Sequence, residues 1–201
     1  MVEAILFDFD GVIRQWDEPA LWNYEEKAGY LPGTVFAIAF DPEVNGPAII
    51  GDWTWKQWKD ETRRRLTVIH GQAIWPIVDQ FFAFEGRIDS GMRDLLGKLE
   101  NQVKLGLLTN NHDDFERYLS EQGLERYFDF VGNTCRLKVA KPDPAAYLLA
   151  LKALNVQPDA CLFVDDLERN VQGAVDVGMR AFHFTSKKEL VAELNSLKIF
   201  V

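Results

Sequence analysis

The chain has little cysteine, little histidine and no long apolar run. Only two of its 201 residues are cysteines, Cys135 and Cys161, and only three are histidines, His70, His112 and His183. Two isolated cysteines do not support a disulfide framework, and the scattered histidines lack the spacing of a zinc site. These shortages exclude small disulfide-stapled domains and zinc modules as the class of protein.

Membrane and nucleic-acid proteins are disfavoured on similar grounds. Apolar residues make up 47% of the chain, yet no run of them reaches the roughly 20 residues of a spanning helix. Glu3 and Asp8 interrupt the first apolar stretch, so we expect no signal peptide and a cytoplasmic location. A formal net charge of −9 opposes non-specific binding to nucleic acid. We therefore expect a soluble protein that acts on neither membranes nor nucleic acid.

The most informative segment is the opening one, Val2–Val12, with the sequence VEAILFDFDGV. It predicts a buried strand that ends in two carboxylates, Asp8 and Asp10, on the same face and about 7 Å apart. A hard cation such as Mg²⁺ would offset their repulsion, leaving one carboxylate as nucleophile and the other for proton transfer. The alternative is a strand that ends in a polar turn at Gly11.

A second apolar strand is predicted over Lys104–Asn111, followed by a helix over His112–Gln122. Thr109 and Asn110 would then lie at a strand-to-helix junction, where a hydroxyl and free backbone N–H groups can hold a phosphate. The same two residues also suit an ordinary helix N-cap. This segment alone does not decide between the two interpretations.

Two later segments follow the same pattern. Lys141 precedes a proline that can start a helix, and its point charge suits phosphoryl oxygens, although such lysines are also common in solvated loops. Cys161–Asp166 is a third apolar run ending in paired acids, Asp165 and Asp166, which could equally complement a helix dipole. Three apolar strands thus deliver polar groups at their carboxyl ends, where open parallel α/β sheets bind ligands.

Taken together, these segments resemble the four ordered motifs of the haloacid dehalogenase-like (HAD) hydrolases. The motifs are Asp8 to Val12, Thr109-Asn110, Lys141-Pro142 and Asp165-Asp166, with Asn170 and Gly173-Ala174 downstream. The resemblance implies an α/β fold with a Rossmann-like parallel sheet flanked by helices and a small α-helical cap. It places the catalytic core at 1–13 and 87–201 and the cap at 14–86.

The resemblance also implies roles for the acidic residues. Asp8 corresponds to the nucleophile and Asp10 to the general acid/base, whose backbone carbonyl also meets the metal. Asp166, assisted by Asp165, corresponds to the acidic part of a Mg²⁺ site. True haloacid dehalogenases lack the second aspartate of the first motif, so Asp10 indicates phosphoryl transfer.

The remaining motif residues correspond to the phosphate site of the family. Thr109 and Asn110 resemble its phosphate-binding pair, and Lys141 resembles the lysine that steadies the nucleophile and the phosphoryl group. Arg136 and Lys138 depart from the pattern, because related chains often carry an acid and a glycine there. These two basic residues would either favour a substrate with a second anionic group or belong to a solvent-facing loop.

The insert between the first motif and the second strand has a different character. It predicts helices at Asp17–Ala28, Trp53–Thr67 and Gln72–Phe82, hence a small helical bundle. Arg14 and Trp16 at its start would lie over the nucleophile and contact the leaving group of the substrate. Trp16 could instead belong to the core of the cap. Elsewhere we expect helices at Ser90–Glu100, capped by Ser90, at Leu167–Val177 and at Lys187–Leu197, and a strand at Arg180–Phe184.

The sequence therefore predicts a Mg²⁺-dependent phosphatase that acts on a small phosphorylated metabolite through an aspartyl-phosphate. The alternatives are a phosphotransferase or phosphomutase of the same fold, and a catalytically idle relative that binds a phosphorylated ligand. Trp16 and Ala20 stand where the related sugar-phosphate mutases carry threonine and histidine, which disfavours the mutase. Substrate identity and oligomeric state stay open.

Overall fold

Five parallel strands form the central sheet of the computed structural model, which describes residues 1–201 except the side chain of Glu18. The strands are β1 (Ala4–Phe7), β4 (Lys104–Thr109), β5 (Phe130–Asn133), β6 (Cys161–Asp165) and β7 (Arg180–His183). Their order across the sheet is β5-β4-β1-β6-β7, and every neighbouring pair is parallel. The three central strands are the three apolar runs whose ends carry the predicted site residues.

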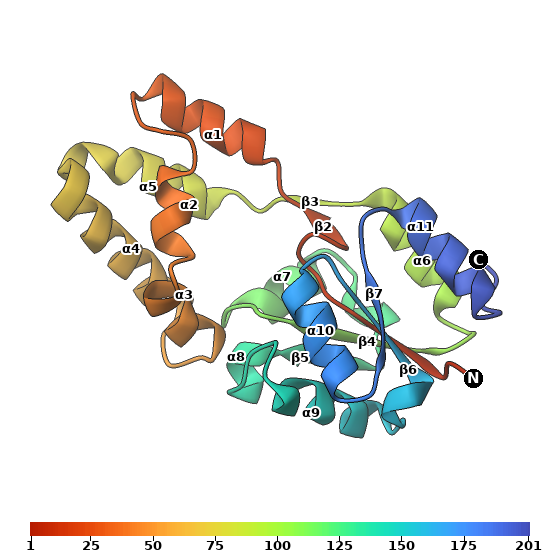
Figure 1. Cartoon of the computed structure of the whole chain (residues 1–201). Helices are drawn as coiled ribbons and strands as arrows, with labels where there is room; N and C mark the ends of the chain where they lie inside the picture. Colours follow the sequence, from red (N-terminus) through yellow and green to blue (C-terminus); the bar gives the residue numbers. More distant parts are fainter.

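Helices cover both faces of this sheet (Figure 1). One apolar cluster joins the sheet to α6 (Ser90–Leu99), α7 (Phe115–Glu121) and α11 (Lys187–Ser196). A second cluster on the other face joins it to α9 (Pro144–Leu154) and α10 (Glu168–Asp176). The short helix α8 (Thr134–Leu137) follows β5, and single 3₁₀ turns lie at Glu125–Tyr127 and Pro158–Ala160. This confirms the predicted α/β, Rossmann-like core flanked by helices.

The register of the central strands brings their carboxyl ends together. Phe7 pairs with Leu107 of β4 on one side and with Val164 of β6 on the other. The residues that follow these positions, among them Asp8 and Thr109, therefore emerge along one edge of the sheet. This edge is where ligands bind in open α/β sheets.

Five helices lie between the short strands β2 (Arg14–Gln15) and β3 (Arg87–Ile88), which pair antiparallel. They are α1 (Glu18–Lys27), α2 (Thr34–Ala39), α3 (Pro42–Ile49), α4 (Trp55–His70) and α5 (Trp75–Ala83), with a 3₁₀ turn at Gln72–Ile74. We call α1–α5 the helical insert. It has an apolar cluster of its own that includes Val35, Trp58 and Leu66, and it stands to one side of the sheet (Figure 1).

Several elements differ from those predicted. The helix expected from His112 begins only at Phe115, because the side chains of His112 and Asp113 contact the insert instead. The sequence pattern did not predict α2, α3 or β5. The α3 segment contains Pro42, Gly46 and Pro47, which weaken a helical signal.

Two helix starts were also predicted wrongly. Asp89, not Ser90, caps α6, because its carboxylate accepts a hydrogen bond from the backbone N–H of Met92 at 2.9 Å. The helix expected from Pro142 starts two residues later and is capped by Asp143. Both caps are aspartates, which rank among the strongest N-cap residues.

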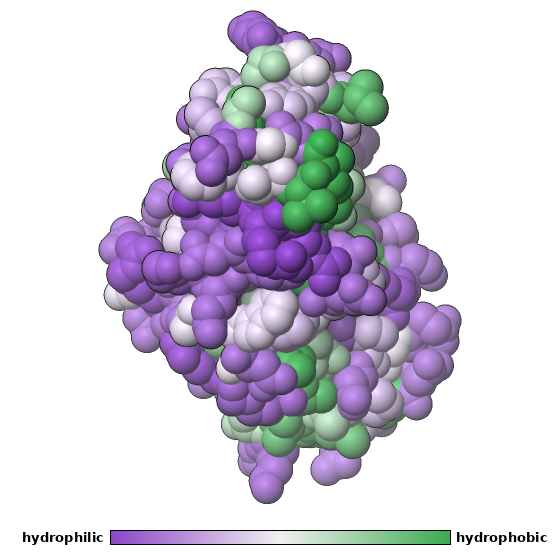
Figure 2. All heavy atoms as spheres, turned by 90° about the vertical axis from the view of Figure 1, so that its left-hand side faces the viewer, coloured by the Kyte–Doolittle hydropathy of each residue, from purple (hydrophilic) through white to green (hydrophobic). Residues whose placement is uncertain are grey.

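The outer face of the insert is mostly hydrophilic, with an apolar patch in its upper part (Figure 2). The run Arg63–Arg65 lies on α4 and pairs with acidic neighbours, which include Glu61 and Asp79. The run is thus an ion-paired helix surface. In the described residues, none of the helices has the length and apolarity needed to cross a membrane.

Candidate active site

A lysine bridges two buried aspartates at the sheet edge. The Nζ atom of Lys141 lies 2.8 Å from Asp8 Oδ1 and 2.7 Å from Asp165 Oδ2. Asp8 directly follows β1, and Asp165 is the last residue of β6. All three side chains are at most 8% exposed. Three segments distant in sequence thus place opposite charges in direct contact within the protein.

Burial dominates the electrostatics of this group. It raises the pKa of Asp8 well above its usual value, and the nearby Lys141 only partly opposes that effect. Burial also acts against the charge of Lys141, but the carboxylates of Asp8 and Asp165 outweigh it and raise the lysine pKa. Burial, helped by Asp165, raises the pKa of Asp166 to about 6. Burial thus disfavours the negative charge of Asp8 and Asp166, and the ammonium group of Lys141 favours that of Asp8.

The donor set fits a hard divalent cation. Asp8, Asp165 and Asp166 each offer an oxygen, and these oxygens all lie within 4.8 Å of one another. Three carboxylates against one ammonium group leave two formal negative charges, which a divalent ion would balance. Oxygen ligands of this kind suit Mg²⁺.

Gly11 lets the backbone of the first motif approach this cluster. A Cβ atom at Gly11 would lie only 2.1 Å from Asp166 Oδ2, and the residue has a φ of +81°. Both the close approach and the left-handed conformation favour glycine. The turn expected at Gly11 is thus present, and it lies against the acidic cluster.

Two asparagines hold the charged residues in place. The side-chain amide of Asn110 accepts a hydrogen bond from the backbone N–H of Lys141 at 2.9 Å and donates one to its carbonyl at 3.0 Å. Asn170 Nδ2 lies 3.1 Å from both carboxylate oxygens of Asp165. Thr109 is buried at the end of β4. In this structure, Asn110 orients Lys141.

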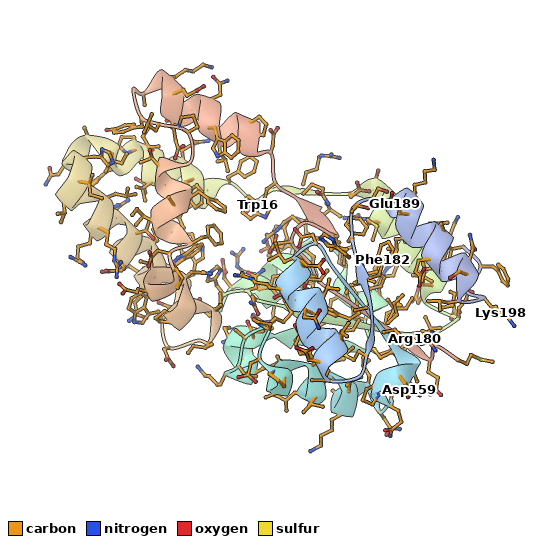
Figure 3. All side chains as sticks on the ribbon, in the orientation of Figure 1. Trp16, Asp159, Arg180, Phe182, Glu189 and Lys198 are labelled. Atoms are coloured by element: carbon orange, nitrogen blue, oxygen red, sulfur yellow. The ribbon has the colours of Figure 1, made fainter. Side chains whose placement is uncertain are left out.

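The carboxylate of Asp10 is held by a different set of donors. It accepts hydrogen bonds from Arg14 Nε at 2.6 Å, Arg14 Nη2 at 3.0 Å, Trp16 Nε1 at 2.8 Å and Asn111 Nδ2 at 3.1 Å. Figure 3 labels Trp16 at the junction between the insert and the core. Alternation along an extended strand predicted that Asp8 and Asp10 share a face. Since β1 ends at Phe7, their side chains have separate partners.

The guanidinium of Arg14 is packed among aromatic rings. Its Cζ atom lies 5.1 Å from the ring centroid of Phe9 and 4.9 Å from those of Trp16 and Tyr118. Burial acts against its charge, but the bonds to Asp10 outweigh this and raise the pKa of Arg14. Arg14 is therefore a fixed charged partner of Asp10.

Sequence reasoning missed two residues next to the second motif. Asn111 contacts Asp10, as described above. The ring of His112 stacks on Trp58 of the insert at 4.0 Å between centroids, and its Nε2 lies 3.3 Å from Asn45 Oδ1. Burial lowers the pKa of His112 to about 4. The only sequence signal was the position of Asn111 and His112 directly after Thr109-Asn110.

Comparison with known proteins identifies the family. The family model described as "Hydrolase: haloacid dehalogenase-like hydrolase" matches residues 2–178. This range holds most of the chain and includes all four motif segments. The chain therefore belongs to the haloacid dehalogenase-like hydrolases, which confirms the resemblance seen in its motifs.

Individual relatives refine this picture. Phosphatase MT3486 of Mycobacterium tuberculosis (strain CDC 1551 / Oshkosh) is 39% identical over 187 residues, covering 90% of this chain and 86% of the relative. Bifunctional epoxide hydrolase 2 of Rattus norvegicus is 28% identical over 191 residues, covering 86% of this chain and 34% of that protein. The chain thus spans about a third of the length of the rat relative.

A solved structure shows the same fold. A HAD family enzyme from Bacteroides thetaiotaomicron, in complex with magnesium and inorganic phosphate, matches with a TM-score of 0.73 and 20% identity. The match covers 94% of this chain and 99% of that one. At this level of identity the likeness supports the fold.

Proposed function

We propose that the chain is a Mg²⁺-dependent phosphatase that hydrolyses a small phosphomonoester through an aspartyl-phosphate on Asp8. The observation that carries this proposal is the buried contact of Asp8 with Lys141 beside the acidic cluster of Asp165 and Asp166. A relative named as a phosphatase, 39% identical, and a neighbour solved with magnesium and inorganic phosphate support it.

The first half-reaction transfers the phosphoryl group to the protein. A carboxylate oxygen of Asp8 attacks phosphorus, the bond from phosphorus to the leaving oxygen breaks, and Asp10 gives its proton to the departing alcohol. Lys141 lies against Asp8 and offers positive charge to the phosphoryl oxygens. Thr109 and Asn110 complete the proposed phosphate site.

The second half-reaction regenerates the protein. A water molecule attacks phosphorus, Asp10 takes its proton, and the bond from phosphorus to the Asp8 oxygen breaks to release inorganic phosphate. Asp10 thus ends the cycle protonated, as it began. Mg²⁺, held by Asp8, Asp165, Asp166 and the backbone carbonyl of Asp10, would neutralise the charge of the transferring group.

The helical insert is the proposed cap. We assign 14–86 to the cap and 1–13 with 87–201 to the catalytic core. A cap beside the sheet edge would exclude bulk water and contact the leaving group, and so select the substrate. Arg14 and Trp16 lie at its start and are the proposed specificity residues.

The test is a phosphate-release screen over a broad panel of phosphorylated metabolites in the presence of Mg²⁺. We expect release from a subset of the panel, loss of release on chelation, and recovery when Mg²⁺ is added back. Phosphate transfer to a second metabolite rather than to water would favour a phosphotransferase. Metal-independent halide release from a 2-haloacid would overturn the proposal, because halide displacement by an aspartate needs no cation.

A further inference from the structure

The helical insert contacts the core at a second place besides its β2 and β3 linkers. We call this place the second attachment. Figure 1 shows the end of α3 close to α8 at the lower edge of the insert. On the insert side the second attachment comprises Asn45, Ile49, Gly51, Trp55 and Trp58, and on the core side His112, Asp113, Thr134, Cys135 and Lys138.

One half of the second attachment is built on α8. Thr134 Oγ1 donates a hydrogen bond to the carbonyl of Ile49 at 2.8 Å, and Lys138 Nζ donates one to the carbonyl of Gly51 at 2.6 Å. A Cβ atom on Gly51 would lie 2.3 Å from the carbonyl oxygen of Cys135. The loop between α3 and α4 therefore rests directly on the backbone of α8.

The other half is built on the loop that follows β4. Asp113 Oδ1 accepts a hydrogen bond from the backbone N–H of Trp55 at 2.7 Å, at the start of α4. The ring of His112 lies flat on the buried ring of Trp58, with an angle of 16° between their planes. Its Nε2 faces Asn45 Oδ1. This loop is thus fixed from the insert side.

Both connections of the insert lead to the carboxylate of Asp10. The β2 linker supplies Arg14 and Trp16, which donate three hydrogen bonds to it. The loop after β4 supplies Asn111, whose Oδ1 accepts the backbone N–H of His112 at 3.0 Å while its Nδ2 donates to Asp10. Asn111 is thus bonded to the backbone of the residue whose ring stacks on the insert.

We propose that the second attachment positions Asp10 for proton transfer, acting through His112 and Asn111. The position of the insert on the core then determines the orientation of the Asp10 carboxylate. The proposal rests on the acid/base role of Asp10 in the proposed function. It also gives Lys138 a purpose that the sequence left open: its charge binds the insert rather than a second anionic group of the substrate.

The decisive variant is Gly51→Ala, with Gly29→Ala as the matched control. Both glycines lie in the insert at positive φ, +72° and +85°, but only Gly51 has neighbours that an added Cβ would strike. Gly51→Ala should push the insert off α8. Gly29→Ala introduces the same kind of backbone strain without a collision. Lys138→Met, with the exposed Lys152→Met as its control, removes one bond of the attachment without backbone strain.

The kinetic readout is the ratio of kcat/KM for the best alkyl phosphate of the screen to that for p-nitrophenyl phosphate. An alkoxide needs the proton of Asp10 to leave, whereas p-nitrophenolate does not. A misplacement of about 1 Å can cost roughly 10²-fold in rate. We expect Gly51→Ala to lower the ratio at least about tenfold, Lys138→Met to lower it less, and both controls to leave it unchanged.

Hydrogen exchange supplies a readout that does not depend on activity. In Gly51→Ala the backbone amides of Trp55 and His112 should exchange faster than in Gly29→Ala, since the bonds they donate belong to this region. Unchanged exchange would overturn the second attachment. Faster exchange with an unchanged ratio, in a folded variant, would overturn its link to Asp10. If the wild-type protein protects the amides of Trp55 and His112 from exchange but releases no phosphate from any substrate, the second attachment stands. The proposed function, and with it the link to proton transfer, would then be wrong.

Discussion

The sheet edge buries its ion pairs, whereas the helical insert places most of its ion pairs on its surface. At the edge, Lys141, Asp8 and Asp165 are buried together, although burying charged groups opposes folding unless they are well paired. In the insert, aromatic side chains such as Trp58 fill the interior, and ion pairs such as that of Arg64 lie on the surface. The edge therefore holds groups suited to chemistry, whereas the insert holds groups that stabilise and shape it. Substitutions at the edge should therefore mainly cost activity, and truncations in the interior of the insert should mainly cost stability.

The strongest test of the edge is Asp8→Asn. An amide cannot serve as the nucleophile, so turnover should fall by about 10⁶-fold, the size seen when other enzymes lose their nucleophile. The melting temperature should not fall, since burial already opposes the charge of Asp8. The control is Asp143→Asn, because asparagine also caps a helix. Near-normal phosphate release by Asp8→Asn would remove the edge as the site of chemistry.

The matching test of the insert is Trp58→Ala. Trp58 is 5% exposed, and its Nε1 donates to the carbonyl of Ala39 at 2.7 Å. Truncation of such a tryptophan costs about 3 to 5 kcal/mol. Chemical denaturation should show this loss, with a much smaller one for Trp22→Ala, because Trp22 is 38% exposed. Equal losses for the two variants would mean that the insert lacks a packed interior of its own.

The contact of His112 with the insert, at the boundary between the two regions, should make the free energy of unfolding depend on pH. The pKa of His112 is lowered to about 4 from 6.5, so the unfolded chain binds a proton between these pH values that the folded protein does not. The contribution of His112 is present above pH 6.5 and is lost as the pH falls toward 4, by on the order of 3 kcal/mol. His112→Phe keeps a ring against Trp58 and should lose stability less steeply over this range. Parallel curves of unfolding free energy against pH for the two proteins would contradict the assignment.

The smallest expected effect is at the junction itself, in Trp16→Ala. Trp16 donates to Asp10 and lies 5.7 Å from Phe84 between ring centroids. Loss of the Trp16 ring should change the relative kcat/KM among substrates with different leaving groups by about tenfold. The kcat/KM for p-nitrophenyl phosphate should change less. Trp16→Phe, which keeps a ring but loses the N–H, separates packing from the bond to Asp10. An unchanged substrate ranking with a large fall in melting temperature would mean that Trp16 only fills the interior.

Asp8, Thr109 and Asp165 of the sheet edge were predictable because each lies at the end of a short apolar run. The strand endings at Asp8, Thr109 and Asp165 needed only local signals, namely buried runs that stop at polar groups. The outermost strand β5 gave no such signal, because Phe130–Asn133 is short and only half buried at its start. Tertiary packing decided its conformation, as it did for the proline-containing α3.

The partners of Asp10 were not predictable in the same way. Local spacing suggested that Asp10 faces Asp8, but Asn111 reaches it across about a hundred positions of sequence. The late start of α7 has the same origin, since His112 and Asp113 are used in contacts with the insert. Contacts between distant segments leave no periodic pattern in a sequence, and only the folded arrangement contains them.

In the proposed reaction, Asp8 carries the phosphoryl group. The direct measurement is an acid quench of the Asp10→Asn variant during turnover of p-nitrophenyl phosphate with Mg²⁺, followed by mass spectrometry of its peptides. This leaving group departs without a proton from residue 10, whereas hydrolysis of the intermediate needs a base there, so the intermediate should accumulate. We expect the phosphoryl group on Asp8. Release of p-nitrophenolate with a phosphoryl group on another residue, or on none at any time point, would contradict it.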